Sequence, residues 1–449
     1  MKRTNWLLTV AALVSGACDF DIIDPNNPSP LGPNPSRADV AAAAAGILIA
    51  ARQDAADWIL DASILGREGY RFDGSDPRFI TEFLNGPLDP GSGAFGGDHW
   101  LEHYAATRST NDLLNVIGTA SALSVAEQAA TSGFAKTMQA YAFLMVLSAH
   151  AQDSIPVDVN RAVTADPAPF VTNDSALGFA SGLLDDAQAD LGAGGAAFPF
   201  SLPAGFAGFN TPVNFLRFNR ALKVRVEVYR GSLGCGDPCY TAALTALGGS
   251  FVDTSATADL AAGVYFNYST NPGDQANPLF QNPLTGENVV HPSLADSLEA
   301  GDTRLAAKTV TRTPTSAGVP PLTSNRGWTR YPATNASIAI IRNEELILLR
   351  AEANNALTAR DAVAAANDIN YIRVKSGGLA ANGGLSGLSV SQVLDELLVQ
   401  RKYSLLYEGH RWVDMRRTGR LSQILIDRVG DVVFGTLAVP NDEVLARQP

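Results

Sequence analysis

Long stretches of the chain repeat apolar residues every three to four positions, and this helical periodicity limits the possible fold more than any other feature. The stretches cover residues 37–65, 99–118, 124–152, 173–191, 211–233, 343–357, 360–377 and 389–417. Ser36 precedes the first stretch, where it can act as a helix N-cap. Because several neighbouring stretches are separated only by short polar turns, the sequence predicts antiparallel helix pairs.

The predicted pairs have roughly the size of tetratricopeptide repeats, although no strict repeat of about 34 residues is present. Two segments without helical periodicity interrupt them, residues 66–97 and 250–335, and both are rich in Gly, Pro, Asn and aromatic residues. Long loops inside a compact protein are usually functional. We therefore expect a mainly α fold, a single domain over residues 37–449 in which an α/α superhelical body carries two loop insertions that form a ligand face.

The N-terminus has the features of a bacterial export signal. Two basic residues are followed by an apolar stretch at residues 6–14 that is too short to span a bilayer. Small residues then precede Cys18, as in lipoproteins whose new N-terminal cysteine receives lipid such as palmitate. We expect residues 1–17 to be a signal peptide, Cys18 to be lipidated, and the Pro-rich residues 18–36 to be an extended tether. The alternative is an ordinary cleaved signal that leaves an unmodified cysteine.

The chain contains three cysteines. If Cys18 carries a lipid, Cys235 and Cys239 remain, and turn-forming Gly-Asp-Pro separates them. In an oxidising compartment this pair is expected to form a local disulfide that staples the turn and has no redox role. The alternative is a pair of reduced thiols at the same turn.

The formal net charge is −12, which argues against a nucleic-acid partner. Binding to phosphates requires a basic surface, and no Lys/Arg cluster outside the C-terminal region could supply one. No segment after the signal has 18 uncharged apolar residues, so we expect no transmembrane helix in the mature protein.

The stretch YEGHRWVDMRR at residues 407–417 is dense in charge, and it could be an active site or a structural brace. On a helix, Glu408 and Trp412 lie four residues apart, as do His410 and Asp414, and Trp412 and Arg416. Catalysis needs an acid and a base that converge on a cleft. Here opposite charges alternate along one predicted helix, where they can neutralise each other around a tryptophan, so the pattern favours a brace.

This stretch, together with the preceding RKYSLL, resembles the C-terminal signature of the RagB/SusD family of outer-membrane lipoproteins. Further similarity lies in RNEELILLRAEANNAL (342–357), AVAAANDINYIRVKSGG (362–378) and VPNDEVLARQP (439–449), while FNRALKVRVEVYRG (218–231) and HYAATRSTNDLLN (103–115) fall in the expected order. The resemblance assigns a structural role to the signature residues Glu408, His410, Arg411, Trp412, Asp414 and Arg416.

The resemblance implies a tetratricopeptide-like body that is anchored in the bacterial outer membrane and faces outward. It implies binding of a nutrient, most often a glycan, and delivery of that nutrient to a TonB-dependent transporter of the SusC type. It also implies no enzymatic activity, no catalytic residue, no cofactor and no metal. The alternative from a different class is a tetratricopeptide-like adaptor without a small-molecule ligand.

One motif favours an enzyme instead. HWLEH at residues 99–103 matches the inverted zinc-protease pattern H-x-x-E-H, in which His99 and His103 bind zinc and Glu102 acts as base. The motif needs a third ligand from another helix, and no carboxylate-rich helix is evident for that role. The sequence also lacks a G-x-S-x-G elbow, a P-loop and a dinucleotide-binding fingerprint. A zinc hydrolase therefore stays the weaker alternative.

Sugar recognition combines flat aromatic rings with planar polar groups on exposed loops. The loop regions and the start of the next helix supply candidates of this kind: Tyr70, Arg71, Phe72, Asp73, Trp100, Trp328, Arg330 and Tyr331. For each aromatic residue the alternative is a buried anchor that fastens its loop to the helices. The family resemblance transfers no binding residue, because ligand loops differ between members.

Overall fold

The computed structural model describes residues 31–151, 154–162, 164–317 and 322–448. The expected signal peptide, Cys18 and most of the tether lie outside the described residues and stay predictions. Among the helices within these ranges, none combines the length and the apolar character that crossing a bilayer requires.

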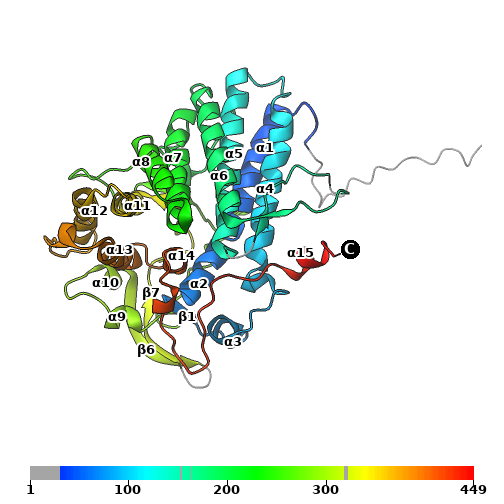
Figure 1. Cartoon of the computed structure of the whole chain (residues 1–449). Helices are drawn as coiled ribbons and strands as arrows, with labels where there is room; N and C mark the ends of the chain where they lie inside the picture. The colour runs from blue at the N-terminus through cyan, green and yellow to red at the C-terminus, as the bar shows by residue number, and fades with distance from the viewer. Residues whose placement is uncertain (1–30, 152–153, 163, 318–321, 449) are drawn as a thin grey trace, which may run out of the picture.

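Long helices form most of the molecule, which confirms the mainly α prediction. The upper group in Figure 1 consists of α1 (Arg37–Gln53), α4 (Gly97–Ile117), α5 (Val125–Ala149), α6 (Asn173–Gly192), α7 (Pro212–Arg230) and α8 (Asp237–Gly248). From α4 to α8, each helix packs against the next one along the chain, and α1 packs against α4 and α5. The second group contains α11 (Asn343–Ala356), α12 (Ala362–Lys375), α13 (Val390–Ser404) and α14 (Arg411–Arg417).

Capping side chains define where several helices begin. Ser36 accepts a hydrogen bond from the Asp39 N–H, and the Asp39 carboxylate accepts one from the Ser36 N–H. Ser124 forms the same reciprocal box at the start of α5, and Ser389 forms it at the start of α13. Each box satisfies backbone N–H groups that have no partner in the first helical turn. The sequence-based prediction of Ser36 as an N-cap is confirmed.

Two predicted helices are divided in the structure. The stretch 37–65 forms α1 and α2 (Ala55–Leu65), which meet at Asp54. The stretch 389–417 forms α13 and α14, with a turn at residues 405–410 where Tyr407 has φ 60° and Gly409 has φ 79°. A Cβ on Gly409 would lie 2.6 Å from Nε1 of Trp58. Positive φ and this close approach both favour glycine at position 409, just before α14 begins.

The two predicted loop regions contain more regular structure than expected. Residues 66–97 include β1 (Gly69–Arg71) and α3 (Arg78–Asn85). Residues 250–335 include β4 (Gly263–Phe266), β5 (Asn288–Val290), α9 (Ser293–Asp296), α10 (Arg304–Lys308), β6 (Thr309–Ala317) and β7 (Leu322–Trp328). Short strands between Gly- and Pro-rich turns lack a sustained alternating pattern, so periodicity did not reveal them.

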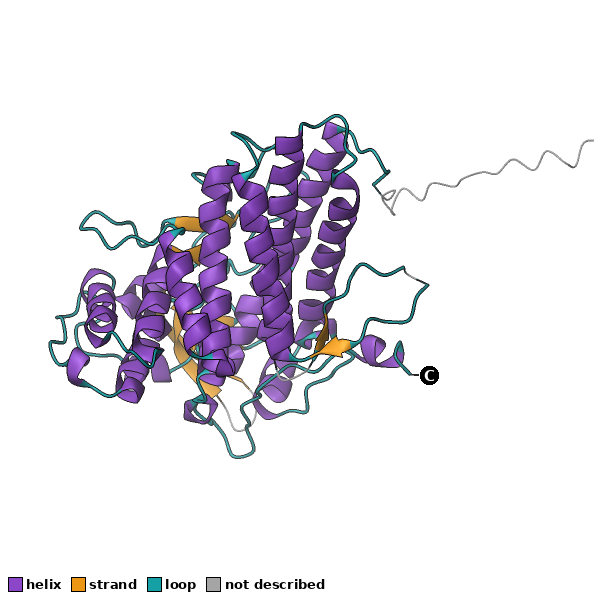
Figure 2. Cartoon of the chain, turned by 45° about the horizontal axis from the view of Figure 1, so that its top comes forward, coloured by secondary structure: helices purple, strands orange, loops and turns teal. Residues whose placement is uncertain are grey.

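One four-stranded sheet joins both regions in the order β1-β5-β7-β6, and all the described pairs are antiparallel. Tyr70 pairs with Val289, Val289 with Gly327, and Thr309 with Trp328. Two smaller sheets pair β4 with β8 (Ile338–Arg342), and β2 (Ile155–Pro156) with β3 (Phe170–Val171). Figure 2 shows the strands as short segments at the sides of the helical body. The C-terminal segment continues to the short α15 (Asn441–Leu445).

The main hydrophobic core is continuous from the upper helices into the four-stranded sheet, and a second cluster lies among α11, α12 and α13. Close helix approach depends on small residues at specific points. A Cβ on Gly133 of α5 would lie 2.6 Å from the side chain of Leu191 on α6. The two helices therefore pack more closely there than any larger residue would allow.

Candidate functional site

The four-stranded sheet brings together the two regions from which a ligand face was predicted. β1 comes from residues 66–97, while β5, β6 and β7 come from residues 250–335. We call the surface of this sheet with the adjoining residues 71–73 the sheet face. In Figure 1 it lies below the helices, beside α3 and the segment that leads to α15. The geometry thus creates one surface from segments about 200 residues apart, as the register of Arg71 with Asn288 shows.

Four of the predicted ligand aromatics are buried: Tyr70 (3% exposed), Trp100 (2%), Trp328 (7%) and Tyr331 (3%). Trp328 stacks on Tyr407 with ring centroids 4.2 Å apart and planes 5° apart. The Tyr331 hydroxyl donates to the Tyr407 carbonyl at 3.1 Å. This corrects the expectation that these rings are exposed, and Trp328 and Tyr331 instead fasten their segment to the signature turn. Contact of these rings with a ligand stays a prediction.

Tyr70 and Trp100 are held by further internal partners. Tyr70 lies with its ring centroid 4.8 Å from that of His291. Burial raises the pKa of Tyr70, and a hydrogen bond to the Asp427 carboxylate adds to the effect. Trp100 lies with its centroid 5.2 Å from His150, near the start of α4. Asp427 was missed by the sequence reasoning, which attached no meaning to residues 422–438.

The remaining loop candidates are partly exposed. Phe72 stacks on Tyr70, with centroids 5.4 Å apart and planes at 15°. Arg71 lies over the Phe79 ring at 4.6 Å and forms ion pairs with Asp73 at 2.9 Å and with Glu287 at 3.4 Å. These contacts hold a flat ring and planar charged groups at the edge strand β1. The arrangement has the combination of groups that sugar recognition requires.

The β6–β7 hairpin exposes mainly uncharged polar side chains, although Arg326, which lies opposite Thr311 in the register, is partly exposed. Thr311, Thr313, Thr323 and Asn325 are all exposed there. Hydroxyl and amide groups both donate and accept hydrogen bonds. The sheet face therefore offers a partly exposed aromatic ring on β1 and uncharged hydrogen-bonding groups on β6 and β7.

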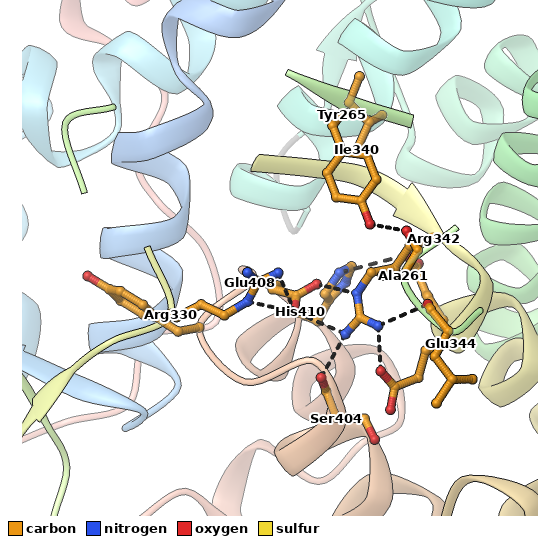
Figure 3. A network of polar contacts seen from close by, with 12 residues as sticks. Ala261, Tyr265, Arg330, Ile340, Arg342, Glu344, Ser404, Glu408 and His410 are labelled. Atoms are coloured by element: carbon orange, nitrogen blue, oxygen red, sulfur yellow. Dashed lines mark hydrogen bonds and ion pairs between the residues drawn. The ribbon is translucent and has the colours of Figure 1, made fainter. Parts of the chain in front are cut away.

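The signature stretch forms a buried network of ion pairs rather than a cleft (Figure 3). Glu408 lies between Arg330 at 3.1 Å and Arg342 at 2.9 Å, and Arg342 also binds Glu344. Burial alone would raise the pKa of Glu408, but the two guanidinium groups lower it well below its usual range. Arg330, expected as a ligand contact, is instead paired with this carboxylate, and its contact with a ligand stays a prediction.

A second part of the network surrounds Asp414. Arg401 lies 2.6 Å from this carboxylate and Arg417 lies 2.8 Å from it, while Arg417 also pairs with Glu352. Burial opposes ionisation of Asp414, but the arginines hold its pKa near 2. Glu408 and Arg417 thus pair with residues outside the stretch, namely Arg330 after β7, Arg342 on β8 and Glu352 on α11. Asp414 pairs with Arg401 and Arg417, which both lie within the predicted helical stretch. The prediction that the charges neutralise one another along one helix therefore holds for Asp414 but not for Glu408.

The other signature residues anchor separate segments. Trp412 is fully buried, and its Nε1 donates to the Phe434 carbonyl at 2.7 Å. Arg416 stacks over the Trp412 ring at 4.5 Å, which agrees with the predicted spacing of four residues. Arg411 donates to the Gly66 carbonyl at 3.0 Å. Burial lowers the pKa of His410 to about 4, so its ring is neutral near pH 7. The geometry supports the interpretation of this stretch as a brace.

Sequence reasoning missed the partners of this brace. Arg225 on α7 pairs with Glu345 on α11 at 2.6 Å, and both side chains are buried. Buried charges normally occur in pairs, so arginines and glutamates inside strongly apolar helices were the available signal. The sequence contained this signal in NEELILLRAE and in LKVRVEV.

The histidines of HWLEH occupy an ionic cluster that does not fit a zinc site. His99 Nδ1 lies 2.7 Å from Asp54, His99 Nε2 lies 3.0 Å from Asp61, and His103 Nε2 lies 3.0 Å from Asp54. Burial alone would lower the pKa of His99, but Asp54 and Asp61 raise it well above its usual value. A protonated imidazole has no lone pair for a metal. Within the described ranges, no group of three or more acidic, histidine or cysteine residues is arranged for a metal ion.

The cysteine pair lies at the junction of α7 and α8. Cys235 and Cys239 form a disulfide, with Cα atoms 5.8 Å apart. It spans the turn-forming Gly-Asp-Pro and lies where α8 begins. The geometry gives this disulfide the role of a local staple.

One protein-family model matches part of the chain. Residues 299–431 match the model of the SusD family, a range that includes β6, β7, α11 to α14 and the signature stretch. A search of curated proteins gives no match.

The fold is similar to several solved structures. A SusD-like carbohydrate-binding protein from Bacteroides fragilis NCTC 9343 superposes with a TM-score of 0.70 at 15% identity, covering 92% of this chain and 98% of that chain. A laminarin-binding SusD-like protein gives a TM-score of 0.64 at 15% identity, with 92% and 98% coverage. Surface glycan-binding protein A from Bacteroides uniformis gives 0.61 at 16% identity, with 86% and 92% coverage. At these identities the likeness concerns the fold.

Proposed function

Because the chain belongs to the SusD family of non-catalytic binding proteins, we propose that it is a surface lipoprotein that binds a glycan and delivers it to a TonB-dependent transporter of the SusC type. Two of the structurally similar proteins are a laminarin-binding protein and a surface glycan-binding protein, and they support a glycan ligand for this chain by analogy. Outward orientation and anchoring through Cys18 are part of the same proposal.

The observation that carries the glycan proposal is the composition of the sheet face. Phe72 is partly exposed and backed by Tyr70, so that a flat apolar surface is available to the C–H face of a sugar ring. Arg71 and Asp73 are fixed beside it by their ion pair. Uncharged hydroxyl and amide groups of β6 and β7 can bond to sugar hydroxyls.

A glycan-array screen of the purified protein, followed by calorimetric titration of the best ligand, tests this proposal. We expect Phe72→Ala to weaken binding by at least about tenfold, because stacking on an aromatic ring contributes on the order of 1 kcal/mol or more. Phe179→Ala is the matched control, since Phe179 is 40% exposed but lies on α6. Equal binding by the parent protein and Phe72→Ala would show that the sheet face is not the binding surface.

Transporter delivery needs a separate experiment. A tagged form of this chain can be expressed in the source bacterium and purified from detergent-solubilised outer membranes. A TonB-dependent transporter should copurify with it in about the same molar amount as the tagged chain. Recovery of other protein partners without a transporter, together with no glycan binding on the array, would favour the adaptor alternative.

A further inference from the structure

A pocket of about 420 Å³ lies between α1, the segment at residues 201–206, and the chain at the end of β4 and after it. One wall is apolar and consists of Leu48, Ile49, Leu202, Pro203 and Phe206. The pocket also contains polar side chains, Arg52, Asn267 and Asp274. None of its lining residues belongs to the four-stranded sheet, so the pocket is separate from the sheet face.

Arg52 organises the polar part of the pocket. Its Nη2 lies 2.7 Å from Asp274 Oδ1, and its Nη1 donates to the Asn267 carbonyl at 2.5 Å. Its guanidinium also lies over the Tyr268 ring at 5.1 Å. Ser269 donates to Asp274 at 2.8 Å, so the segment after β4 is held against α1 through this carboxylate. Because Arg52 and Asp274 neutralise each other, the polar part favours an uncharged hydrogen-bonding group over an ion.

The apolar wall remains open to solvent. Ile49 is 55% exposed although it lines the pocket. Ala45, one turn earlier on α1, lines the same pocket and is also exposed. A concave site with apolar walls, a few convergent polar groups and a volume of several hundred cubic ångströms is the usual form of a small-molecule site.

We propose that this pocket binds a small neutral amphipathic molecule, with an apolar chain or ring against α1 and hydroxyl groups near Arg52, Asn267 and Asp274. An alkyl or aryl glycoside has this chemistry. The apolar part contacts Leu48, Ile49 and Phe206, and the hydroxyl groups exchange hydrogen bonds with the ion pair. This inference does not depend on the proposed function, because the sheet face contributes no residue to the pocket.

Calorimetric titration with octyl β-D-glucopyranoside below its micelle concentration tests the proposal. We expect one binding site per chain. Glucose should bind at least about tenfold more weakly, because it lacks the tail that buries apolar surface. Octyl sulfate should also bind more weakly than the glucoside, since no unpaired cation lines the pocket to receive its anionic head. Equal binding of glucose and octyl glucoside would overturn the proposal.

Two tryptophan variants on the same helix provide the structural control. Ala45→Trp fills the pocket and should abolish octyl glucoside binding. Ala38→Trp places the same side chain two turns earlier on the same face of α1, at another exposed position, and should leave binding unchanged. Thermal unfolding of both variants checks that they fold. Phe72→Ala, which alters only the sheet face, should retain binding. If Ala45→Trp still binds octyl glucoside, or if Phe72→Ala no longer binds it, the amphiphile binds outside this pocket and the proposal is wrong.

Discussion

At the residue scale, the molecule depends on buried ion pairs around the signature turn. Glu408 and Asp414 are each held between two arginines, and all of these groups except Arg330 are buried. A buried ion pair contributes little net stability compared with apolar packing, but removal of one partner leaves a costly unpaired charge. The network therefore specifies how the strands, α11 and the signature turn fit together.

Replacement of Glu408 tests this view. Glu408→Gln should lower the free energy of unfolding by about 3–5 kcal/mol at pH 7, because Arg342 and Arg330 lose their carboxylate. Glu443→Gln removes the carboxylate of a partly exposed pair with Arg447 and should change stability by less than about 1 kcal/mol. Urea unfolding of both variants measures the difference. Similar losses in the two variants would contradict a special role for the buried pair.

The pKa of Glu408 also predicts a pH dependence. Its folded pKa lies below the usual value, so its contribution to stability is complete above about pH 4.5 and is lost as the pH falls through the folded pKa. Acid unfolding of the parent should therefore be steeper than that of Glu408→Gln. Parallel acid-unfolding curves would argue against this assignment.

His99 should produce the opposite pH dependence. Its pKa is raised by Asp54 and Asp61, so the imidazolium contributes fully below about pH 6.5 and its contribution falls as the pH rises towards the folded pKa. The slope from this group is at most about −1.4 kcal/mol per pH unit. Unfolding free energies of the parent and His99→Gln, measured between pH 7 and 9, should show that slope only in the parent. An unchanged slope in the variant would assign the effect to another group.

At the element scale, the main departure from a regular helix is the turn between α13 and α14. This turn directs Glu408 towards Arg342. After the turn, α14 begins at Arg411 and packs against α2. The turn depends on Gly409, whose φ is positive and whose Cα faces Trp58. The structure of this turn was not evident from periodicity, because residues on both sides continue the helical pattern.

Two glycine substitutions separate the backbone and packing effects. Gly419 has a similar φ of 70°, but a Cβ there would meet no atom within 4 Å. Gly419→Ala should therefore cost only the strain of positive φ, about 1 kcal/mol. Gly409→Ala should cost a further 1–3 kcal/mol, roughly, because the new methyl group overlaps Trp58. Urea denaturation compares them, and equal losses would show that contact with Trp58 is unimportant.

At the scale of the whole molecule, helices form the body, and two segments distant in sequence, residues 66–97 and 250–335, form the sheet face. Residues 69–71 reach β5, and β5 in turn reaches β7, so the sheet closes over contacts that are distant in sequence. Arg67 pairs with Asp427 at 3.0 Å, which ties this sheet to the segment after the signature.

Export and anchoring are predicted for the whole chain as well. Expressed in a bacterium that processes lipoproteins, the mature protein should begin at Cys18 and carry a lipid, which mass spectrometry of its N-terminal peptide measures. Cys18→Ser should abolish the lipid and release the protein from the membrane fraction. A mature N-terminus at another residue, or an unmodified Cys18, would support the ordinary-signal alternative.

The sequence by itself determined the helical body, because apolar periodicity and N-cap residues act within one or two turns. Ser36, Ser124 and Ser389 begin helices through contacts with residues three positions away. It also favoured a brace over an active site for the charged signature. Opposite charges in such a short stretch, without a convergent cleft, favour pairing over catalysis.

Only the tertiary structure decided which residues are paired and which are exposed. Trp328 and Phe72 are both aromatic residues in Gly-rich segments, yet Trp328 stacks under Tyr407 and Phe72 remains partly exposed. The partner of Glu408 on β8 lies 66 residues away. Burial and ion pairing depend on contacts between segments that are distant in sequence. Local sequence patterns carry no information about which of these segments pack together.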